Sequence, residues 1–412
     1  MLTRPDVKNG TGLALSMFAV LVAGCDGKYD YSNLQPDGST KVDMGGAAQA
    51  DLSGGSDLSD PTPTDPEKAT LRVHYPKGSH SLAIRGDKAG LTWDKGVAAA
   101  EKSSELFELE VTIPVGETLE WKPLLDDKDW SHGPNYKTKG GQTVDIYPHF
   151  YTSSGRIDKP DDLQNFPGDN LAPRDVWVYL PPSYDENPTA KYPVLYMHDG
   201  TNLFEASMAF GGVEWRVDET LDGAVEGDGS IAEVIVVGVF ATNDRMTDYT
   251  PTFDSTEGFG GNGDAYVTML VDKLKPTIDG KYRTLSGRET TGIMGSSLGG
   301  LISIYAGVRH PEVFGLVGAM SPSTWWDGGY IVTQVAAIDM NKVHPLRVYV
   351  DSGNPGDDYG NTKDLAMTWQ SLGYQEGKDF HYVVEKNGKH SESYWAGRLP
   401  GALNFLFGAR TP

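Results

Sequence analysis

A series of short, almost entirely apolar segments in the second half of the chain constrains the fold more than any other feature. Strands of a parallel sheet read as near-continuous apolar runs because helices cover both faces of the sheet. Segments of this kind, some with partial alternation, occur at 176–180, 192–197, 234–239, 292–294, 316–320, 346–350 and 380–384. Helical spacing of apolar residues is found at 265–278, 301–308, 362–372 and 391–407. The pattern predicts an α/β domain with a mostly parallel sheet covered on both faces.

The residues before this domain have a different character. Short segments with partial alternation are separated by Gly and Pro turns, at 71–75, 82–85, 106–111 and 143–146. Such a stretch predicts a small β-sandwich domain at 69–150. Its large aromatic residues either pack in the core or form a surface that stacks on sugar rings, and both interpretations stay open for Trp93, Trp121, Trp130 and Tyr136.

The beginning of the chain has the composition of a secretory signal. Arg4 and Lys8 precede an apolar run at 13–23, which small residues and Cys25 follow. The run is too short to span a bilayer comfortably. Its end resembles the lipobox of bacterial lipoproteins, in which the cysteine is lipidated and becomes the mature N-terminus. We therefore predict a signal peptide at 1–25, lipidation of Cys25 and a cell-envelope location, on the periplasmic face or the cell surface; an ordinary signal peptide is the alternative.

Residues 26–68 are rich in Asp, Gly, Ser, Pro and Thr, which predicts a disordered acidic linker.

Composition excludes several classes of function. The formal net charge of -22 argues against nucleic acid as a partner, because phosphate binding needs a cationic surface. The single cysteine excludes an intramolecular disulfide. The membrane is expected as a partner only through the lipid anchor, and no oligomeric state is predicted.

Residues 292–300 combine a strand, a sharp turn and the start of a helix. The turn contains Gly295, Ser297 and Gly299 in the pattern G-x-S-x-G. The glycines let the backbone bend tightly enough to hold the middle serine in a strained, exposed position above the end of the sheet. This geometry suits a nucleophile that attacks an acyl carbonyl, so Ser297 is the predicted nucleophile and Ser296 is its neighbour.

A serine nucleophile needs a base, and the base needs an acid that orients it. His390 lies in a polar loop after the last predicted strand and is the predicted base. Asp357 and Asp358 follow the strand at 346–350, and Asp357 is favoured as the acid. A Ser-His dyad is the alternative. The order serine, aspartate, histidine is that of α/β-hydrolases.

Asp351 stands so close to its predicted strand that we assign it a structural role. The segment at 351–358 also lacks the D-x-[DN]-x-[DN]-G spacing of a calcium loop, so no metal site is predicted there.

The remaining site candidates lie in loops that follow other predicted strands. An oxyanion hole takes one N–H group from the residue after the nucleophile, here Leu298, and a second from the loop after an earlier strand, here Gly200 or Thr201. Further candidates for substrate binding are Trp325, Trp326, Arg245 and Tyr249. Packing of the two tryptophans and a structural ion pair of the arginine are the alternatives.

The sequence YPVLYMHDGTNLF at 192–204 resembles the YPVLYMHDGQNLF segment of the enterochelin esterase-like, esterase D-type family. The resemblance extends over 170–409 and departs from the family at Thr201, where glutamine is frequent. Other matching positions are Trp215, Val217, Asp218, Asn243, Arg245, Asp248, Tyr249, Thr250, Pro251, Ser321, Pro322, Ser323, Trp325, Trp326, His390, Ser391, Glu392, Trp395, Arg398, Leu399 and Pro400. Residues 69–150 resemble the N-terminal sandwich of such proteins, which is similar to starch-binding modules.

The resemblance implies an α/β-hydrolase fold at 165–412 and serine ester hydrolysis without a metal or other cofactor. We therefore expect a carboxylic ester hydrolase whose partner is a small-molecule or carbohydrate ester of feruloyl, acetyl or siderophore type. Two alternatives stay open. One is an acyltransferase with the same Ser-His-Asp triad, and the other is a catalytically silent carbohydrate-binding surface protein.

Overall fold

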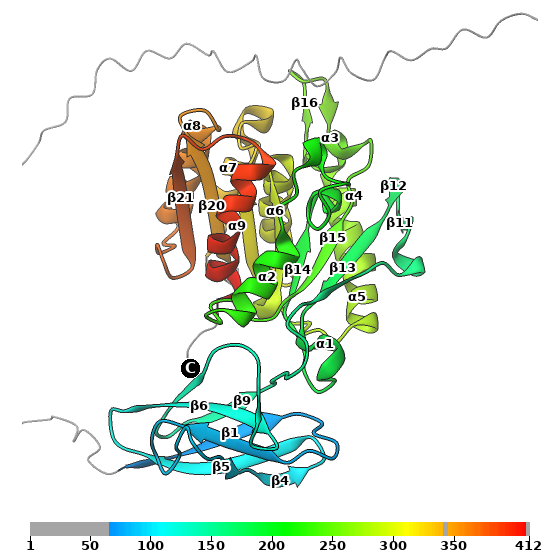
Figure 1. Cartoon of the computed structure of the whole chain (residues 1–412). Helices are drawn as coiled ribbons and strands as arrows, with labels where there is room; N and C mark the ends of the chain where they lie inside the picture. Colours follow the sequence, from blue (N-terminus) through cyan, green and yellow to red (C-terminus); the bar gives the residue numbers. More distant parts are fainter. Residues whose placement is uncertain (1–65, 341–344, 409–412) are drawn as a thin grey trace, which may run out of the picture. The chain divides into compact units, whose positions relative to one another are not determined.

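The computed structural model describes residues 66–340 and 345–408 (Figure 1). The chain divides into two compact units, 1–60 and 61–412, and all described residues belong to the second. The predicted signal peptide, Cys25 and most of the predicted linker lie outside the described residues. Across 66–340 and 345–408, none of the helices combines the length and the apolar character that a membrane crossing requires.

Two sheets form the strand-rich N-terminal part of the second unit. One has the order β4-β5-β1-β9, and the other has the order β3-β2-β6-β7 with β8 paired to β6. Their strands are β1 (Glu67–His74), β2 (Leu82–Gly86), β3 (Val97–Ala98), β4 (Ala100–Ser103), β5 (Leu106–Ile113), β6 (Thr118–Leu125), β7 (Asp129–Trp130), β8 (Tyr136–Lys139) and β9 (Thr143–Ile146). The first two residues of β1, Glu67 and Lys68, lie within the predicted linker. The domain boundary at residue 150 stays a prediction.

The hydrophobic core of this part follows from alternation along its strands. Every second residue of β1 is buried, including Leu71 and Val73, and these side chains pack with those of the other sheet. Trp121 of β6 is completely buried in this core. The other two tryptophans are not core residues, because 36% of Trp93 and 40% of Trp130 is exposed.

The second half of the chain forms an eight-stranded sheet of order β10-β13-β15-β14-β18-β19-β20-β21. Its strands are β10 (Arg156–Asp158), β13 (Val176–Leu180), β14 (Val194–Met197), β15 (Ile235–Val239), β18 (Thr291–Ser296), β19 (Leu316–Met320), β20 (Arg347–Asn354) and β21 (Phe380–Lys386). Every neighbouring pair from β15 to β21 is parallel, and β10 and β13 add antiparallel pairs at one edge. The predicted α/β fold with a mostly parallel sheet is therefore confirmed.

The remaining elements connect these strands. The short strands β11 (Phe166–Gly168) and β12 (Leu171–Arg174) pair with each other, as do β16 (Phe253–Asp254) and β17 (Phe259–Gly260). The helices are α1 (Ser183–Glu186), α2 (Val217–Glu226), α3 (Arg245–Asp248), α4 (Gly263–Met269), α5 (Lys275–Lys281), α6 (Leu298–Arg309), α7 (Trp326–Ala336), α8 (Tyr359–Ser371) and α9 (Glu392–Phe407). A π-helical turn, Leu270–Leu274, joins α4 to α5, so the predicted helix at 265–278 is interrupted in its middle.

Successive side chains of a strand enter cores on opposite faces of the sheet. In β14, Val194 and Tyr196 pack with residues of α6, α7 and α8, whereas Leu195 and Met197 pack with residues of α2 and α9. Figure 1 shows α2 and α9 beside each other over one face of the sheet. This double coverage explains why the strands are apolar without interruption. It also leaves the loops after the strand ends as the place for polar chemistry.

Candidate active site

Ser297 stands at a strained turn between β18 and α6. Its φ of 57° and ψ of -123° lie outside the regions that residues with a side chain ordinarily adopt. Neighbouring groups hold the turn: the Ser297 N–H donates to Met320 O at 3.0 Å, and Ser297 O accepts from Ser323 N at 3.0 Å. A Cβ atom on Gly295 would lie 2.8 Å from the carbonyl carbon of Gly299. Close backbone approach thus requires the first glycine of the G-x-S-x-G pattern.

The hydroxyl of Ser297 hydrogen-bonds to another serine. Its Oγ lies 3.3 Å from Ser323 Oγ in the loop after β19. Within the described residues, no hydrogen bond links Ser297 Oγ to His390. The predicted nucleophile is therefore on a sharp turn, as expected, but its hydroxyl contacts Ser323 and not the predicted base.

His390 and Asp357 form a direct pair. His390 Nδ1 lies 2.6 Å from Asp357 Oδ1, while the imidazole keeps 41% of its side-chain surface exposed. The second carboxylate oxygen of Asp357 accepts from Ser321 Oγ at 2.5 Å and from Gly353 N at 2.8 Å. Burial alone would raise the pKa of Asp357, but these hydrogen bonds outweigh it and hold the pKa below its ordinary value. The carboxyl group is therefore ionised and fixed.

Asp358 has other partners although it is adjacent. Its carboxylate accepts from Thr324 Oγ1 at 2.9 Å and from Asn361 Nδ2 at 2.6 Å. Burial raises the pKa of Asp358 above its ordinary value. Of the two predicted acids, the geometry therefore favours Asp357 as the partner of His390.

A buried network positions the Asp357 carboxylate. Ser321 Oγ donates to Asp357 and accepts from Arg398 Nη2 at 2.8 Å and from Trp395 Nε1 at 3.0 Å. Arg398 also forms an ion pair with Asp351, at 2.9 Å from Nε to Oδ2. Complete burial raises the pKa of Asp351 to about 6 in spite of this arginine. The expected structural role of Asp351 agrees with these contacts.

The predicted oxyanion donors lie at the start of α6 and in the loop after β14. Leu298 is the first residue of α6, so its N–H group has no acceptor within the helix. Gly200 begins a 3-10 turn, Gly200–Asn202, directly after Asp199 in the left-handed conformation. A Cβ atom on Gly200 would lie 2.6 Å from Phe240 Cδ1, so only glycine fits there. Asp199 Oδ2 would be 3.4 Å from a Cβ on Gly299, which places this loop beside the helix start.

The contacts of Arg245 and Tyr249 are structural. Arg245 holds both carboxylate oxygens of Asp199, at 2.6 and 2.8 Å. Tyr249 is completely buried, and its hydroxyl accepts from Asp199 N at 3.3 Å. Arg245 therefore forms a structural ion pair, which was the alternative to a role in substrate binding. We correct the assignment of Tyr249 to substrate binding, because the side chain has no exposed surface.

The two adjacent tryptophans differ in exposure. Trp326 is completely buried, and its Nε1 donates to Thr252 O at 3.0 Å. We therefore correct its assignment to substrate binding as well. Trp325 stays partly exposed, with its ring centroid 5.7 Å from that of Trp326. Only Trp325 of this pair offers a surface to a ligand.

A protein-family model described as "Putative esterase" matches residues 172–406, which is more than half of the chain. The chain belongs to this esterase family. The esterase family implied by the resemblance is confirmed, and the protein is a carboxylic ester hydrolase.

Individual proteins are similar to large parts of this chain. The uncharacterized protein YbbA of Bacillus subtilis is 26% identical over 245 residues, which cover 56% of this chain and 91% of YbbA. The siderophore triacetylfusarinine C esterase of Aspergillus fumigatus is 26% identical over 176 residues, which cover 41% of this chain and 58% of that protein. A solved structure of a ferulic acid esterase is 22% identical, with a TM-score of 0.49, and the match covers 62% of this chain and 98% of that chain.

Sequence reasoning gave no role to several residues that the esterase brings to its site. Ser321 and Ser323 match the family pattern, but their hydrogen bonds to Asp357 and Ser297 were not predicted. The hydrogen bonds of Trp395 and Arg398 to Ser321 were not predicted either. One signal was available, since Ser321 and Ser323 directly follow a predicted strand at the same sheet edge as Ser297. Arg398 reaches Ser321 from α9, and no sequence pattern indicates this contact.

The buried ion pair between Arg398 and Asp351 should contribute strongly to the stability of the esterase. Arg398→Met leaves Asp351 buried without its partner, so we expect the free energy of unfolding to fall by about 3 kcal/mol or more. Urea unfolding followed by circular dichroism measures this change. Arg156→Met is the control, since its pair with Asp185 is exposed and should change stability by less than about 1 kcal/mol. Equal losses in the two variants would contradict the structural role of Arg398.

Proposed function

We propose that this esterase hydrolyses carboxylic esters through a Ser297-His390-Asp357 triad and an acyl-enzyme. One observation carries the proposal. Ser297 occupies the strained turn after β18, and at the same sheet edge His390 is fixed by Asp357 at 2.6 Å. A nucleophile at a sharp strand-to-helix turn and an imidazole oriented by a buried carboxylate are the parts that acyl transfer requires.

In the proposed mechanism, His390 Nε2 removes the Ser297 proton as Oγ attacks the ester carbonyl carbon. Asp357 accepts the hydrogen bond from Nδ1–H, which selects the tautomer with Nε2 free to act as the base. The N–H groups of Leu298 and of Gly200 or Thr201 stabilise the oxyanion. The alcohol leaves with the proton from His390, and the acyl group stays on Ser297. Water, deprotonated by His390, then releases the acid and restores the serine.

The hydrogen bond between Ser297 Oγ and Ser323 Oγ requires one additional step. We propose that the serine hydroxyl turns toward His390 when an ester binds. The 3.3 Å separation of the two serine oxygens corresponds to a weak bond, so little free energy opposes the turn. Catalytic hydrogen bonds often become short only in the complex with substrate.

We propose an aromatic acyl ester, of the feruloyl or aryl siderophore type, as the preferred substrate. Trp325 supports this choice, because it is the partly exposed aromatic side chain next to the Ser321–Ser323 loop. An aromatic acyl group can stack on an indole ring, whereas an acetyl group cannot.

A panel of esters tests the proposed function. Rates of acid release would be measured with feruloyl, siderophore, acetyl-xylan and simple acyl esters, with wild-type protein and Trp325→Ala. We expect aromatic esters to exceed acetyl esters by about tenfold or more in kcat/KM, and the variant to lose this preference. No hydrolysis of any ester would contradict the function and favour the silent binding protein. Transfer of the acyl group to an added sugar instead of water would favour the acyltransferase.

We also propose that Cys25 carries a lipid and anchors the esterase in the cell envelope. The support is the sequence around Cys25, which has a basic start, a short apolar run and small residues before the cysteine. Cys25→Ser should therefore move the protein from the membrane fraction to the soluble fraction of expressing bacteria. Fractionation followed by immunoblotting measures this, with wild-type protein as the control. An unchanged membrane-bound fraction in the variant would contradict the proposal.

A further inference from the structure

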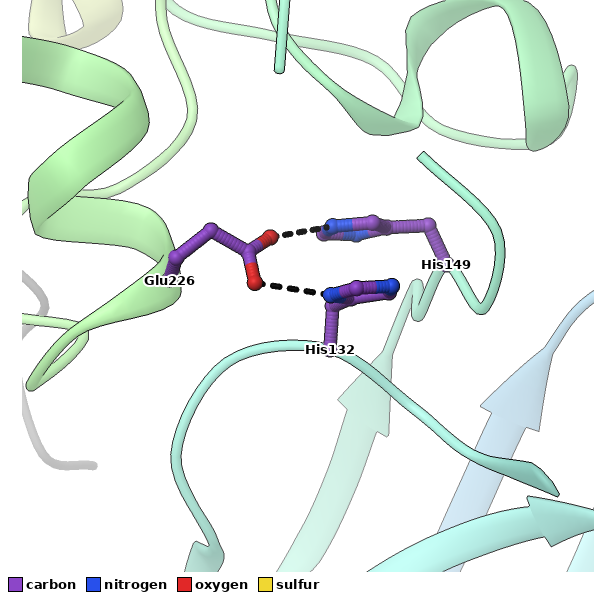
Figure 2. A group of neighbouring side chains, drawn as sticks. All are labelled: His132, His149 and Glu226. Atoms are coloured by element: carbon purple, nitrogen blue, oxygen red, sulfur yellow. Dashed lines mark hydrogen bonds and ion pairs between the residues drawn. The ribbon is translucent and has the colours of Figure 1, made fainter. Parts of the chain in front are cut away.

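We propose that His132, His149 and Glu226 form a binding site for a divalent transition-metal ion, with Zn²⁺ as the expected ion. Figure 2 shows both imidazoles directed at the same carboxylate. His132 Nδ1 lies 2.7 Å from Glu226 Oε2, and His149 Nε2 lies 3.1 Å from Glu226 Oε1. One ligand atom from each residue can be chosen so that all lie within 4.8 Å of one another.

The three residues come from separate elements that hold them in place. His132 lies between β7 and β8, His149 lies after β9, and Glu226 is the last residue of α2. The backbone joins the two histidines, since His132 N donates to His149 O at 2.8 Å. Their rings are nearly parallel, with an interplanar angle of 2° and centroids 5.2 Å apart. The ligand set is therefore already brought together.

This cluster differs from the other contacts of histidine with carboxylates. Within residues 66–340 and 345–408, Glu226 is the carboxylate that receives two imidazoles. The other pairs have a single histidine each and are His74–Asp145, His80–Asp126, His310–Glu312, His381–Glu376 and His390–Asp357. One imidazole is enough to form an ion pair with a carboxylate. The presence of a second imidazole at Glu226 therefore indicates a metal site.

The donor atoms suit zinc. Two imidazole nitrogens and one carboxylate oxygen are common zinc ligands, and a water molecule can complete the tetrahedron. With metal–ligand distances near 2.1 Å, tetrahedral ligand atoms lie about 3.4 Å apart. The nitrogen–oxygen distances of 2.7 and 3.1 Å therefore need to open by less than about 1 Å each. Small rotations of side chains that are between 6% and 29% exposed would achieve this.

The charges around the site are compatible with a cation. Glu233 lies close enough to His149 and Glu226 to interact with both electrostatically. Lys122 is the opposing cation, but its ammonium group donates to Gly133 O, and burial lowers its pKa. The two carboxylates give this region negative charge that a divalent ion can offset.

Metal binding by the full chain tests this proposal. After chelation and dialysis, we expect about one Zn²⁺ per chain, measured by elemental analysis, with saturation in the micromolar range. Zn²⁺ in excess should raise the melting temperature by about 5 °C, because the ion binds the folded state only. Co²⁺ bound in place of zinc should give the visible absorption of a four-coordinate site, which reports the ligand geometry directly.

Variants identify the ligands. Glu226→Gln keeps the shape of the side chain and its hydrogen-bonding capacity, and His149→Gln removes one imidazole. Each should weaken Zn²⁺ binding by about 100-fold and abolish the thermal shift. His310→Gln is the matched control, since it breaks a histidine–carboxylate pair elsewhere and should bind zinc like the wild type.

Two results would overturn the proposal. One is the lack of saturable Zn²⁺ binding to the folded wild-type chain. The other is unchanged affinity in Glu226→Gln and His149→Gln. Circular dichroism and ester hydrolysis report whether each variant is folded. If one does not fold, His132→Gln replaces it, because that side chain is the most exposed of the three.

Discussion

Ser297→Ala should abolish ester hydrolysis while the protein stays folded. The substitution removes the oxygen that forms the acyl-enzyme, so we expect kcat to fall by about 10⁴-fold or more. Alanine can occupy the strained turn about as well as serine does, since both residues carry a Cβ atom and the two hydrogen bonds that hold the turn involve only the backbone of residue 297. Hydrolysis of a short p-nitrophenyl ester, with circular dichroism for folding, measures the effect.

The adjacent serine provides a matched control. Ser296 is buried at the end of β18 and has the same chemistry as Ser297, but its side chain is not at the centre of the turn. Ser296→Ala should therefore keep kcat within a few-fold of the wild type. Full activity in Ser297→Ala, or equal losses in the two variants, would show that the nucleophile is misassigned.

Asp357→Asn should have the second-largest effect, a loss of about 10⁴-fold in kcat. An asparagine amide can donate to His390 Nδ1, which would hold the imidazole in the tautomer that cannot accept the serine proton at Nε2. The variant also loses the negative charge that stabilises the imidazolium. The kcat of purified protein over a range of pH measures the loss, which should persist across neutral pH.

Asp358→Asn is the control for this prediction, since the same change is made one residue away. Its carboxylate contacts Thr324 and Asn361 instead of His390, so kcat should change by less than about tenfold. A larger loss in Asp358→Asn than in Asp357→Asn would reverse the assignment of the acid. Losses of similar size would place both carboxylates in a shared structural role.

The strands of the α/β domain could be predicted because burial on both faces leaves an uninterrupted apolar run. The bounds of β13 and β19 agree with the prediction to the residue. α7 was not predicted, because it begins with Trp326 and continues through Asp327, Gly328 and Gly329, all three of which have positive φ. In the sandwich, β6 was not predicted, because it contains Pro123 and proline is rare in the interior of a strand.

The candidate triad could be predicted from order along the chain, because the loops after parallel strands gather at one edge of the sheet. Burial in a loop could not be predicted in this way. Tyr249 and Trp326 follow strands as the triad residues do, but they turn inward and pack. The network around Ser321 joins residues from distant loops and from α9, so no local pattern indicates it.

Reaction with a fluorophosphonate probe tests the central claim most directly, because the probe bonds covalently to an activated serine. Labelled protein would be digested and the modified residue located by mass spectrometry. We predict one adduct per chain on Ser297, with no adduct in Ser297→Ala and normal labelling of Ser296→Ala. An adduct on a different residue, or an unlabelled protein that still hydrolyses esters, would contradict the assignment of Ser297 as the nucleophile.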